Sequence, residues 1–495
     1  MQYTINSGAI AKQRTDLLII NVCNGQVPRD AGFKALDQST DGLLSKLIKR
    51  GDVGTSFGAS CLIPDTGSKA AAARILLINC GDDCDMAPSQ YVKLMQAVFK
   101  ATKGLAIKDM VLATLDIPVK DSDMAWKILQ SIWACASSLY QFDTFKKTKP
   151  PQPTLKKLTL AIADNAKHRQ AVKEAKAIVN GMATARTLGD TPPNVCTPTY
   201  LASAARQLAN KHAKMSAKIL NEAQMAKLGM HLLLSVSQGS KQGAKLIILE
   251  YKGAAKTEKP LVLVGKGITF DTGGINLKPS ANMEEMKYDM MGAASVLGAI
   301  QAAAEIGVKQ NIVAIVAAAE NFPAYEATKP SDIIKSMSGQ TVEILNTDAE
   351  GRLILADALT YAERYKPKAV LTVATLTGAI IVALGNHTTG LFTDNDKLAH
   401  SLSAAGDASF DRVWRLPIWE CYQEMLKNDF ADMGNISKGP GAGSITAACF
   451  LSRFASAYDW AHLDVAGTAF GWQTGIRGAT GRPVPLLTRF LLDYK

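Results

Sequence analysis

The sequence predicts an α/β protein in which a smaller N-terminal α/β domain is joined by a long helix to a larger C-terminal domain with a mostly parallel, helix-covered sheet. Three observations indicate this fold class. Strand-like and helix-like segments alternate through all 495 residues, as in α/β folds. A Pro-rich segment, Phe145–Lys157, interrupts the alternation after the first third of the chain. The chain also exceeds the roughly 150 residues of one ordinary domain.

Residues 1–165 are expected to form the N-terminal α/β domain. Short β-rich runs occupy residues 16–22 and 73–80, and helical patterns lie at 89–102 and 124–140. Apolar runs of this length, bounded by polar or Gly-containing segments, are typical of buried strands. Residues 158–163 are expected to be the last strand of this domain.

Residues 166–190 are expected to form the linking helix. The segment 167–188 is rich in Ala, Lys and Glu, which favour helices. It is followed by Gly189-Asp190-Thr191-Pro192-Pro193, a strong helix stop because Gly and Pro do not continue a helix.

Residues 191–495 are expected to form the C-terminal domain. Its strands are near-continuous apolar runs, as expected for strands covered on both faces. Ala-rich helical patterns separate them, notably at 292–306 and 353–365. The expected strands are KLIILEY, LVLVGKG, NIVAIVAAAE, TVEILN, AVLTVAT and AHLDVAG.

Composition excludes several protein classes. Hydrophobic residues make up 47% and charged residues 20%, which excludes a disordered, collagen-like or coiled-coil chain. The longest uncharged apolar stretch, residues 369–385, is too short and too interrupted by Thr and Gly for a membrane span. The N-terminal residues lack the order of a secretory signal. We therefore expect a cytoplasmic protein without a membrane partner.

The net charge of +11 is concentrated in the front third of the chain. Residues 1–170 hold 22 Lys and Arg against 15 Asp and Glu. The densest part is Phe145–Lys157, which has five Lys, three Pro and no acid. A solvated linker and a nucleic-acid contact both explain such a segment, because Lys clusters neutralise phosphates.

Charged residues follow the strands of the C-terminal domain, where ligand sites of open α/β sheets lie. One group follows LVLVG and the other follows TVEIL. Taken singly, each residue is readily explained as a solvated loop charge. Together they would gather four carboxylates, two lysines and one arginine at one rim: Lys266, Asp271, Lys278, Asp289, Asp348, Glu350 and Arg352.

Four carboxylates between apolar strands repel one another unless positive charge compensates them. Two Lys and one Arg supply part of that charge, and divalent metal ions supply it more completely. Oxygen ligands without nearby His suit Mg²⁺, Mn²⁺ or Zn²⁺. Two ions bridged by shared carboxylates form an arrangement used for hydrolytic displacement. The chain has no HExxH, GxSxG, P-loop or complete GxGxxG motif, which argues against zincins, serine hydrolases, NTPases and dinucleotide-binding proteins.

Three motifs carry a specific resemblance. NTDAEGRL at 346–353, VGKGITFDTGGINLKPS at 264–280 and MKYDMMGAA at 286–294 resemble the leucyl aminopeptidase family of cytosolic two-metal peptidases, including the bacterial aminopeptidase A type. The similarity covers about residues 175–490, and the front domain resembles the family only in size and general pattern.

The resemblance implies a metal site with five ligands. Asp271 and Glu350 would bridge two divalent ions, Asp348 would complete one site, and Lys266 with Asp289 would complete the other. A lysine binds a metal only as the neutral amine, so Lys266 would have to lose its proton.

The resemblance also implies roles in catalysis and substrate binding. Lys278 would stabilise the oxygen that becomes negative at the tetrahedral intermediate, and Arg352 would hold a bicarbonate that acts as general base. The pocket for the first side chain would include Met286, Thr375, Leu376 and Gly378. For Met286 core packing is nearly as good an explanation, because Met at helical spacing commonly fills gaps.

The expected function is therefore a metal-dependent aminopeptidase that releases N-terminal residues, preferring leucine-like side chains, from peptides with a free N-terminus. It would use two Mn²⁺, Zn²⁺ or Mg²⁺ ions per subunit, together with bicarbonate, and would assemble as a homohexamer. Two alternatives remain at this point. A two-metal phosphoesterase uses similar carboxylate clusters, and a DNA-binding role would use the basic front third.

Overall fold

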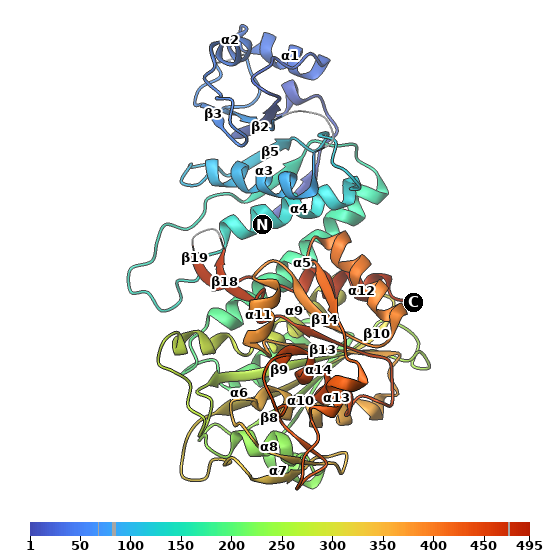
Figure 1. Ribbon diagram of the computed structural model, residues 1–495. Coiled ribbons are helices and arrows are strands. Elements are labelled where there is room, and N and C mark those ends of the chain that lie inside the picture. Colours follow the sequence, from blue (N-terminus) through green and yellow to red (C-terminus); the bar gives the residue numbers. More distant parts are fainter. Residues whose placement is uncertain (68, 82–85, 474–475) are drawn as a thin grey trace. The chain divides into compact units, whose positions relative to one another are not determined.

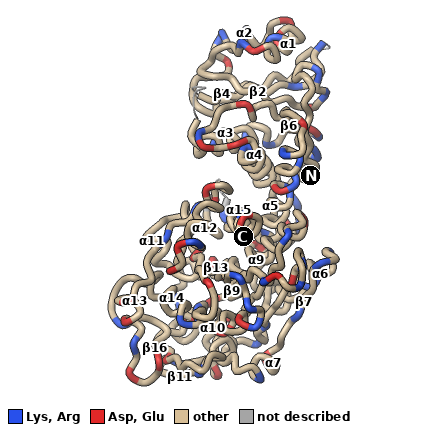
Figure 2. The backbone as a smooth tube through the Cα atoms, turned by 90° about the vertical axis from the view of Figure 1, so that its right-hand side faces the viewer, with Lys and Arg blue, Asp and Glu red and all other residues tan. Residues whose placement is uncertain are grey.

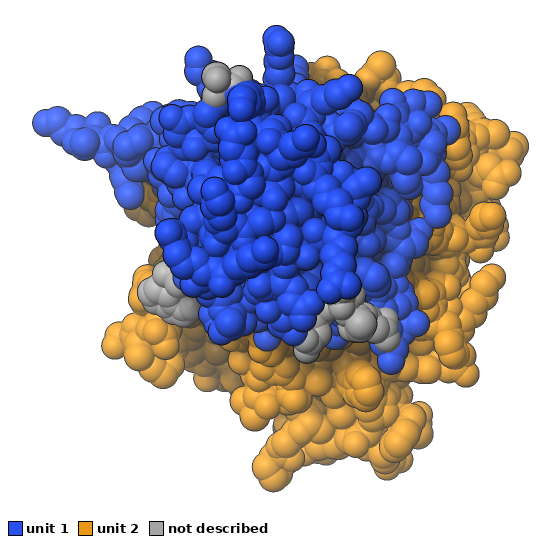
Figure 3. All heavy atoms as spheres, turned by 90° about the horizontal axis from the view of Figure 1, so that it is seen from above, with its two compact units in different colours: residues 1–179 blue, residues 180–495 orange. Residues whose placement is uncertain are grey.

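The computed structural model describes residues 1–67, 69–81, 86–473 and 476–495. The chain forms two compact units, residues 1–179 and 180–495, which Figure 3 colours separately. Helix α5 (Ala166–Asp190) begins in the first unit and ends in the second. The domain boundaries expected from the sequence, 1–165, 166–190 and 191–495, stay a prediction. Among the described residues, no helix combines the length and apolar character needed to cross a membrane.

The first unit contains a six-stranded sheet with the order β1-β6-β5-β2-β4-β3. All neighbouring pairs are parallel except β3 with β4 at one edge. The central strands are the most apolar, and every residue of β4 is buried. The strands are β1 (Gln2–Ile5), β2 (Leu17–Val22), β3 (Ser60–Ile63), β4 (Ile75–Asn79), β5 (Asp109–Ala113) and β6 (Lys157–Leu160).

Helices cover both faces of this sheet (Figure 1). Helices α1 (Ala31–Ser39) and α2 (Leu43–Arg50) pack on the even-numbered side chains of β2. Helices α3 (Pro88–Ala101) and α4 (Met124–Leu139) pack side by side on the other face. Helix α4 begins where Asp123 Oδ1 accepts the Trp126 N–H at 3.0 Å, because a capping carboxylate satisfies a donor of the first helical turn.

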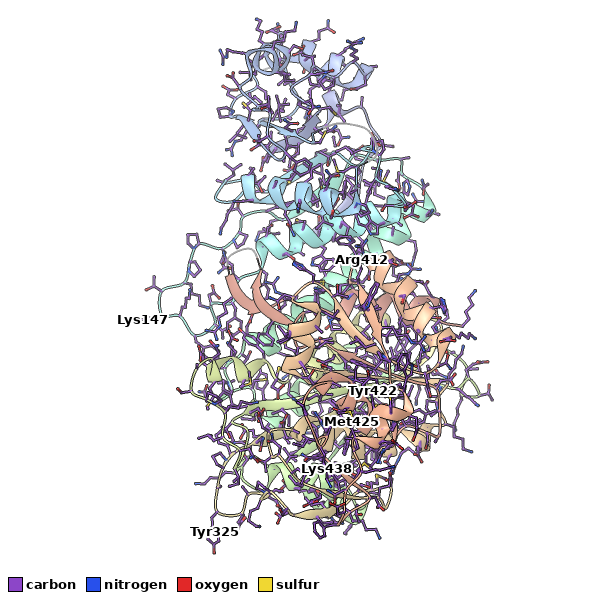
Figure 4. All side chains as sticks on the ribbon, in the orientation of Figure 1. Lys147, Tyr325, Arg412, Tyr422, Met425 and Lys438 are labelled. Carbon is purple, nitrogen blue, oxygen red and sulfur yellow. The ribbon has the colours of Figure 1, made fainter. Side chains whose placement is uncertain are left out.

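The Lys-rich segment between α4 and β6 is an exposed loop without regular structure as far as residue 156. The side chain of Lys147 projects from it in Figure 4. The Pro residues explain this conformation, because they remove backbone donors that a helix or a central strand needs.

The second unit contains an eight-stranded sheet with the order β15-β14-β17-β13-β9-β10-β8-β7. Its four central strands, β17, β13, β9 and β10, are parallel to one another, while β8 and β14 run antiparallel to their central neighbours. The strands are β7 (Met215–Leu220), β8 (Lys245–Lys252), β9 (Leu261–Asp271), β10 (Asn311–Asn321), β13 (Ala369–Ala374), β14 (Thr389–Phe392), β15 (Val413–Leu416) and β17 (Trp460–Asp464). The predicted mostly parallel, helix-covered sheet is confirmed.

Helices again cover both faces of the sheet. The core on one face includes α8 (His231–Ser237), α10 (Glu350–Ala362) and α14 (Gly443–Ser452). On the other face α9 (Met291–Ile306) packs on β9 and on α15 (Val484–Asp493). The remaining helices of this unit are α6 (Pro198–Lys211), α7 (Glu222–Lys227), α11 (Gly378–Leu384), α12 (Asp396–Ser409) and α13 (Glu420–Glu424).

One expected strand of the main sheet lies elsewhere. Residues 341–343 of TVEILN form β12 (Thr341–Glu343), which pairs with β11 (Ile333–Lys335) and β16 (Met433–Gly434) in a separate three-stranded sheet. Val342 of β12 is buried in the same core as residues of α8 and α10. A short apolar run does not reveal which strands it will pair with. The remaining short elements are β18 (Phe470–Gln473), β19 (Ile476–Ala479), η1 (Ile10–Lys12), η2 (Met283–Tyr288) and η3 (Glu363–Tyr365).

Candidate metal centre

Strand β9 supplies Lys266 from its middle and Asp271 as its last residue. Five residues apart, these side chains would point to opposite faces of a regular strand. The pairing with β10 is irregular here, because Ile268 faces Ala319 and Asp271 faces Asn321. Strand β9 therefore carries one extra residue, and such a bulge shifts the alternation. The bulge brings both side chains to the same side.

The other acidic residues come from two loops. Asp289 directly follows η2, and Asp348 and Glu350 lie at the start of α10. The turn before α10 is held by Asn346, whose Oδ1 accepts the Asp348 N–H at 2.8 Å. Oxygen atoms of Asp271, Asp348 and Glu350 all lie within 4.8 Å of one another.

Two lysines lie among the carboxylates. Lys266 Nζ is 2.7 Å from Asp289 Oδ2 and 2.8 Å from Glu350 Oε1, and it donates to the Thr375 carbonyl at 3.0 Å. Lys278 Nζ is 2.9 Å from Asp271 Oδ2 and also forms an ion pair with Asp348. The structure thus brings together six of the seven predicted charged residues by direct ion pairs.

The pKa values in the cluster reflect burial and mutual repulsion. Burial, together with the charge of Asp271, raises the pKa of Asp348 to about 6. Burial also raises the pKa of Asp289, although Lys266 opposes this shift. Burial alone would lower the pKa of Lys266, but in the absence of metal ions Asp289, Glu350 and Asp271 outweigh it and raise that pKa. Two divalent ions beside the amine would act in the opposite direction and favour its neutral form. Figure 2 shows acidic and basic positions together where β9 and α10 approach each other.

The donor set fits divalent cations. Asp289 Oδ2, Asp348 Oδ1 and Glu350 Oε1 are buried, and within the described part of the chain each is paired only with a lysine ammonium. Buried carboxylate oxygens of this kind are costly unless a cation satisfies them. Hard carboxylate oxygens are also the ligands that Mg²⁺ and Mn²⁺ prefer.

The seventh residue, Arg352, lies in the first turn of α10 and is 7% exposed. Its Nη1 donates to the Asn435 carbonyl at 2.7 Å, while its Nε is buried without a hydrogen-bond partner among the described residues. Burial lowers the pKa of Arg352 to about 10, and Glu350 opposes the shift. A buried guanidinium with an unused N–H is suited to hold a small anion.

The two ends of the cluster differ in exposure. The side chains of Lys266, Asp289 and Glu350 are at most 8% exposed, whereas those of Lys278 and Asp348 are 21% and 31% exposed. A ligand from solvent therefore reaches the cluster on the side of Lys278 and Asp348.

The residues expected to bind substrate lie on two segments around the cluster. Met286 is half-buried on η2, three residues before Asp289. Thr375 follows β13, and its hydroxyl donates to Asp289 Oδ1 at 2.8 Å. Leu376 is half-buried and Gly378 is exposed on the same segment, at the start of α11.

Sequence reasoning missed several polar residues that hold these loops. Asp464, at the end of β17, accepts the Leu376 N–H at 3.1 Å and the Thr377 hydroxyl at 2.7 Å. Asn435 and Asn321 bind the loops that carry Asp348 and Asp271. Asn321 and Asp464 end central strands of the sheet, and this position is the signal that would have pointed to them.

Comparisons with known proteins agree with this geometry. The catalytic domain of the cytosol aminopeptidase family matches residues 183–488, and the N-terminal domain of the same family matches residues 19–149. The chain belongs to the cytosol aminopeptidase family. A cytosol aminopeptidase from Pseudomonas aeruginosa is 49% identical, covering 100% of this chain and 99% of that protein. A probable cytosol aminopeptidase from Methylobacillus flagellatus is 47% identical, over 99% of each chain.

A solved structure also resembles the whole chain. A mutant of tomato leucine aminopeptidase superposes with a TM-score of 0.86 at 33% identity, covering 99% of this chain and 96% of that one. The predicted family is confirmed. As a member of this family, the protein is a hydrolase of the metal-dependent aminopeptidase class that acts on peptides, and the family implies divalent metal cofactors.

Proposed function

We propose that the carboxylate and lysine cluster is the two-metal centre of this aminopeptidase, with Lys266, Asp271, Asp289, Asp348 and Glu350 as its ligands. The observation that carries the proposal is the group of three carboxylates, Asp271, Asp348 and Glu350, whose oxygens lie within 4.8 Å of one another. When bound, two Mn²⁺, Zn²⁺ or Mg²⁺ ions supply Lewis-acid charge, which lowers the pKa of water and polarises a carbonyl.

The residues around the ligands would perform the remaining chemistry. Lys278 keeps its proton, because Asp271 and Glu350 outweigh burial and raise its pKa. Its ammonium would stabilise the negative oxygen of the tetrahedral intermediate. Arg352 would hold bicarbonate, which supplies a general base. Thr375 would fix Asp289 through its hydroxyl.

Substrate selection would follow from the same segments. Met286, Thr375, Leu376 and Gly378 would line the pocket for the first side chain, and Met286 and Leu376 favour a leucine-like residue. An apolar pocket distinguishes similar apolar side chains only modestly, by roughly 10- to 200-fold per methylene.

The test is hydrolysis of leucine p-nitroanilide by metal-stripped protein to which Mn²⁺, Zn²⁺ or Mg²⁺ is added back. An N-acetylated substrate and an Asp348→Ala variant serve as controls. We expect activity that needs metal and a free α-amine and that is lost in the variant. Glutamate and lysine p-nitroanilides, tested in parallel, measure the side-chain preference. Cleavage of a phosphodiester with no cleavage of the anilide would favour the phosphoesterase alternative instead.

Assembly and location complete the proposal. The family resemblance supports a homohexamer, and sedimentation equilibrium would then give six times the 52.8 kDa of one chain. A cytoplasmic location agrees with the names of the relatives. Fractionation of cells that produce the protein tests it.

DNA binding is a second candidate function, favoured by the Lys-rich segment Phe145–Lys157. Its five Lys include Lys146 and Lys147, which are exposed on a segment without acids. Binding through these residues would weaken steeply with salt, because counterions are released from the phosphates. A gel shift at several salt concentrations tests this, with a variant in which all five Lys are replaced by Gln. A salt-insensitive or absent shift would exclude it.

A further inference from the structure

Asn321, the last residue of β10, contacts both loops that carry the central carboxylates. It is 5% exposed. Its Nδ2 donates to Asp271 Oδ1 at 2.8 Å and to the Thr347 carbonyl at 3.0 Å. One carboxamide therefore joins the end of β9 to the residue that precedes Asp348.

The backbone of Asn321 adds a second attachment to the first loop. Its carbonyl accepts the Thr272 N–H at 3.0 Å and the Thr272 hydroxyl at 2.8 Å. The two loops are also joined directly, since Thr347 Oγ1 donates to the Gly273 carbonyl at 2.7 Å. Asn321 thus lies at the centre of a buried hydrogen-bonded network, which fixes the positions of its members.

The Asn321 carboxamide occupies space that a side chain at position 274 would otherwise fill, and residue 274 is a glycine. A Cβ atom at that position would lie 2.8 Å from Asn321 Oδ1, and the residue has φ +66°. Both the space and the left-handed backbone favour glycine. A larger residue would push the Asn321 side chain away from Asp271.

Asn321 and Lys278 both contact the Asp271 carboxylate, but Asn321 is a neutral hydrogen-bond donor and Lys278 is a charged one. Asp271 Oδ1 accepts N–H bonds from Asn321 and from the Gly273 backbone, the latter at 2.9 Å, while Oδ2 faces Lys278. Both donors to Oδ1 are neutral, so they orient the carboxylate without cancelling its charge. The ammonium of Lys278, by contrast, competes with a divalent cation for the negative charge of Asp271.

We propose that Asn321 is a positioning residue that orients Asp271 for divalent cations and fixes the spacing between the loops of Asp271 and Asp348. This inference rests on the ligand set of the proposed function. Outer partners that orient a metal ligand typically contribute roughly 10- to 100-fold to metal affinity. We expect Asn321→Ala to weaken Mn²⁺ binding by about that factor.

The experiment measures Mn²⁺ affinity by isothermal titration calorimetry on the metal-stripped full-length protein. Asn321→Leu is a second variant, because leucine occupies a similar volume and removes both donors. Asn311→Ala is the matched control. Asn311 begins the same strand and donates to the Ala255 and Glu258 carbonyls at 2.7 and 3.0 Å, far from the cluster along β10. Asp348→Ala tests the ligand set itself, and circular dichroism with thermal melting checks that each variant is folded.

The outcomes separate the two proposals. Weakened Mn²⁺ binding in both Asn321 variants, with wild-type affinity in Asn311→Ala, would support the inference. If Asp348→Ala loses binding while both folded Asn321 variants stay within twofold of wild type, the metal centre stands and the role of Asn321 is wrong. An equal loss in Asn311→Ala would also overturn it, since the effect would then be general loosening of β10. If Asp348→Ala binds like wild type, the ligand set fails, and the inference fails with it.

Discussion

The backbone of Gly351 lies directly against the side chain of Lys266. A Cβ atom on Gly351 would stand 2.7 Å from both Cε and Nζ of Lys266 and 2.9 Å from its Cδ. Because Gly351 follows Glu350 in the first turn of α10, the absence of a side chain lets the buried ammonium reach the Glu350 carboxylate. The approach of α10 to β9 therefore depends on this glycine.

Gly351→Ala is expected to displace the Lys266 side chain and so to weaken the metal site. Overpacking of this kind costs about 1–3 kcal/mol of stability, and Mn²⁺ affinity should fall at least about 10-fold. Calorimetric titration and thermal melting measure the two effects. Gly443→Ala is the control, since a Cβ there would lie an ordinary 3.4 Å from Ala379. Equal metal affinity in the two variants would contradict the prediction.

Lys278→Met is expected to lower kcat by roughly 10²- to 10³-fold, the usual effect of removing a group that stabilises a developing negative charge. Metal binding should persist, because Lys278 forms ion pairs with Asp271 and Asp348 but is not one of the proposed ligands. Steady-state kinetics at saturating Mn²⁺, together with titration of the metal, separates these effects. A variant that loses metal instead of kcat would show that Lys278 serves only to hold the carboxylates.

Asn435→Ala is expected to reduce both stability and activity. The Asn435 carboxamide donates to the Asn346 carbonyl at 2.6 Å and accepts the Leu345 N–H at 2.7 Å, while its own carbonyl binds Arg352. Leaving such buried groups unpaired costs about 1–3 kcal/mol.

Asn395→Ala is the matched control for that variant, because it removes the N-cap of α12, where Asn395 Oδ1 accepts the Leu398 N–H at 2.9 Å. It should lose about 1 kcal/mol of stability while kcat is unchanged. Urea unfolding and kcat are measured for both variants. If Asn435→Ala keeps wild-type kcat, the residue only stabilises the fold.

The stability of the second unit is expected to fall in acid because of His462. Burial lowers the pKa of this imidazole to about 3, below the value of about 6.5 in an unfolded chain. Between these two pH values the unfolded state binds more protons, so the free energy of unfolding falls as the pH falls. The stabilisation is complete above about pH 6.5 and is lost towards pH 3. At pH 5 the loss is about 2 kcal/mol.

Urea unfolding of wild type and His462→Asn at pH 7 and pH 5 measures this effect. The variant should show a smaller loss of stability between the two pH values. His400→Asn is the control, since His400 is exposed on α12. The same pH dependence in wild type and His462→Asn would rule out His462 as the source.

The sequence identifies the charged residues of the site more readily than the polar residues that hold their loops in place. Lys266 and Asp271 belong to a long apolar run and a specific motif, and both signals are local. Asn321 ends another apolar run, but its value depends on the register between β9 and β10, including the bulge after Ile268. Asn435 follows β16, a strand of two residues, which is too short to produce a recognisable hydrophobic pattern. The positions of these two residues depend on how the strands pair, and the composition of the sequence does not reveal that pairing.

The strands also differ in how readily the sequence reveals them. Long buried runs such as those of β9 and β10 are evident because burial on both faces requires continuous apolar sequence. Strand β12 has only three residues and pairs with β11 and β16, so the apolar residues of TVEILN give no indication that this strand lies outside the main sheet. Short partly exposed strands such as β1 and β15 carry too few apolar residues to stand out from loops.

Strand β1 pairs in parallel with β6, and Thr4 and Thr159 exchange a side-chain hydrogen bond across 155 positions of sequence. On the ribosome, Gln2–Ile5 emerges long before its partner exists. At about 5–20 residues per second, synthesis of the intervening chain takes roughly 8–30 s. The first unit thus completes this edge of its sheet only after Lys157–Leu160 has left the exit tunnel, so β1 is paired long after it has been synthesised.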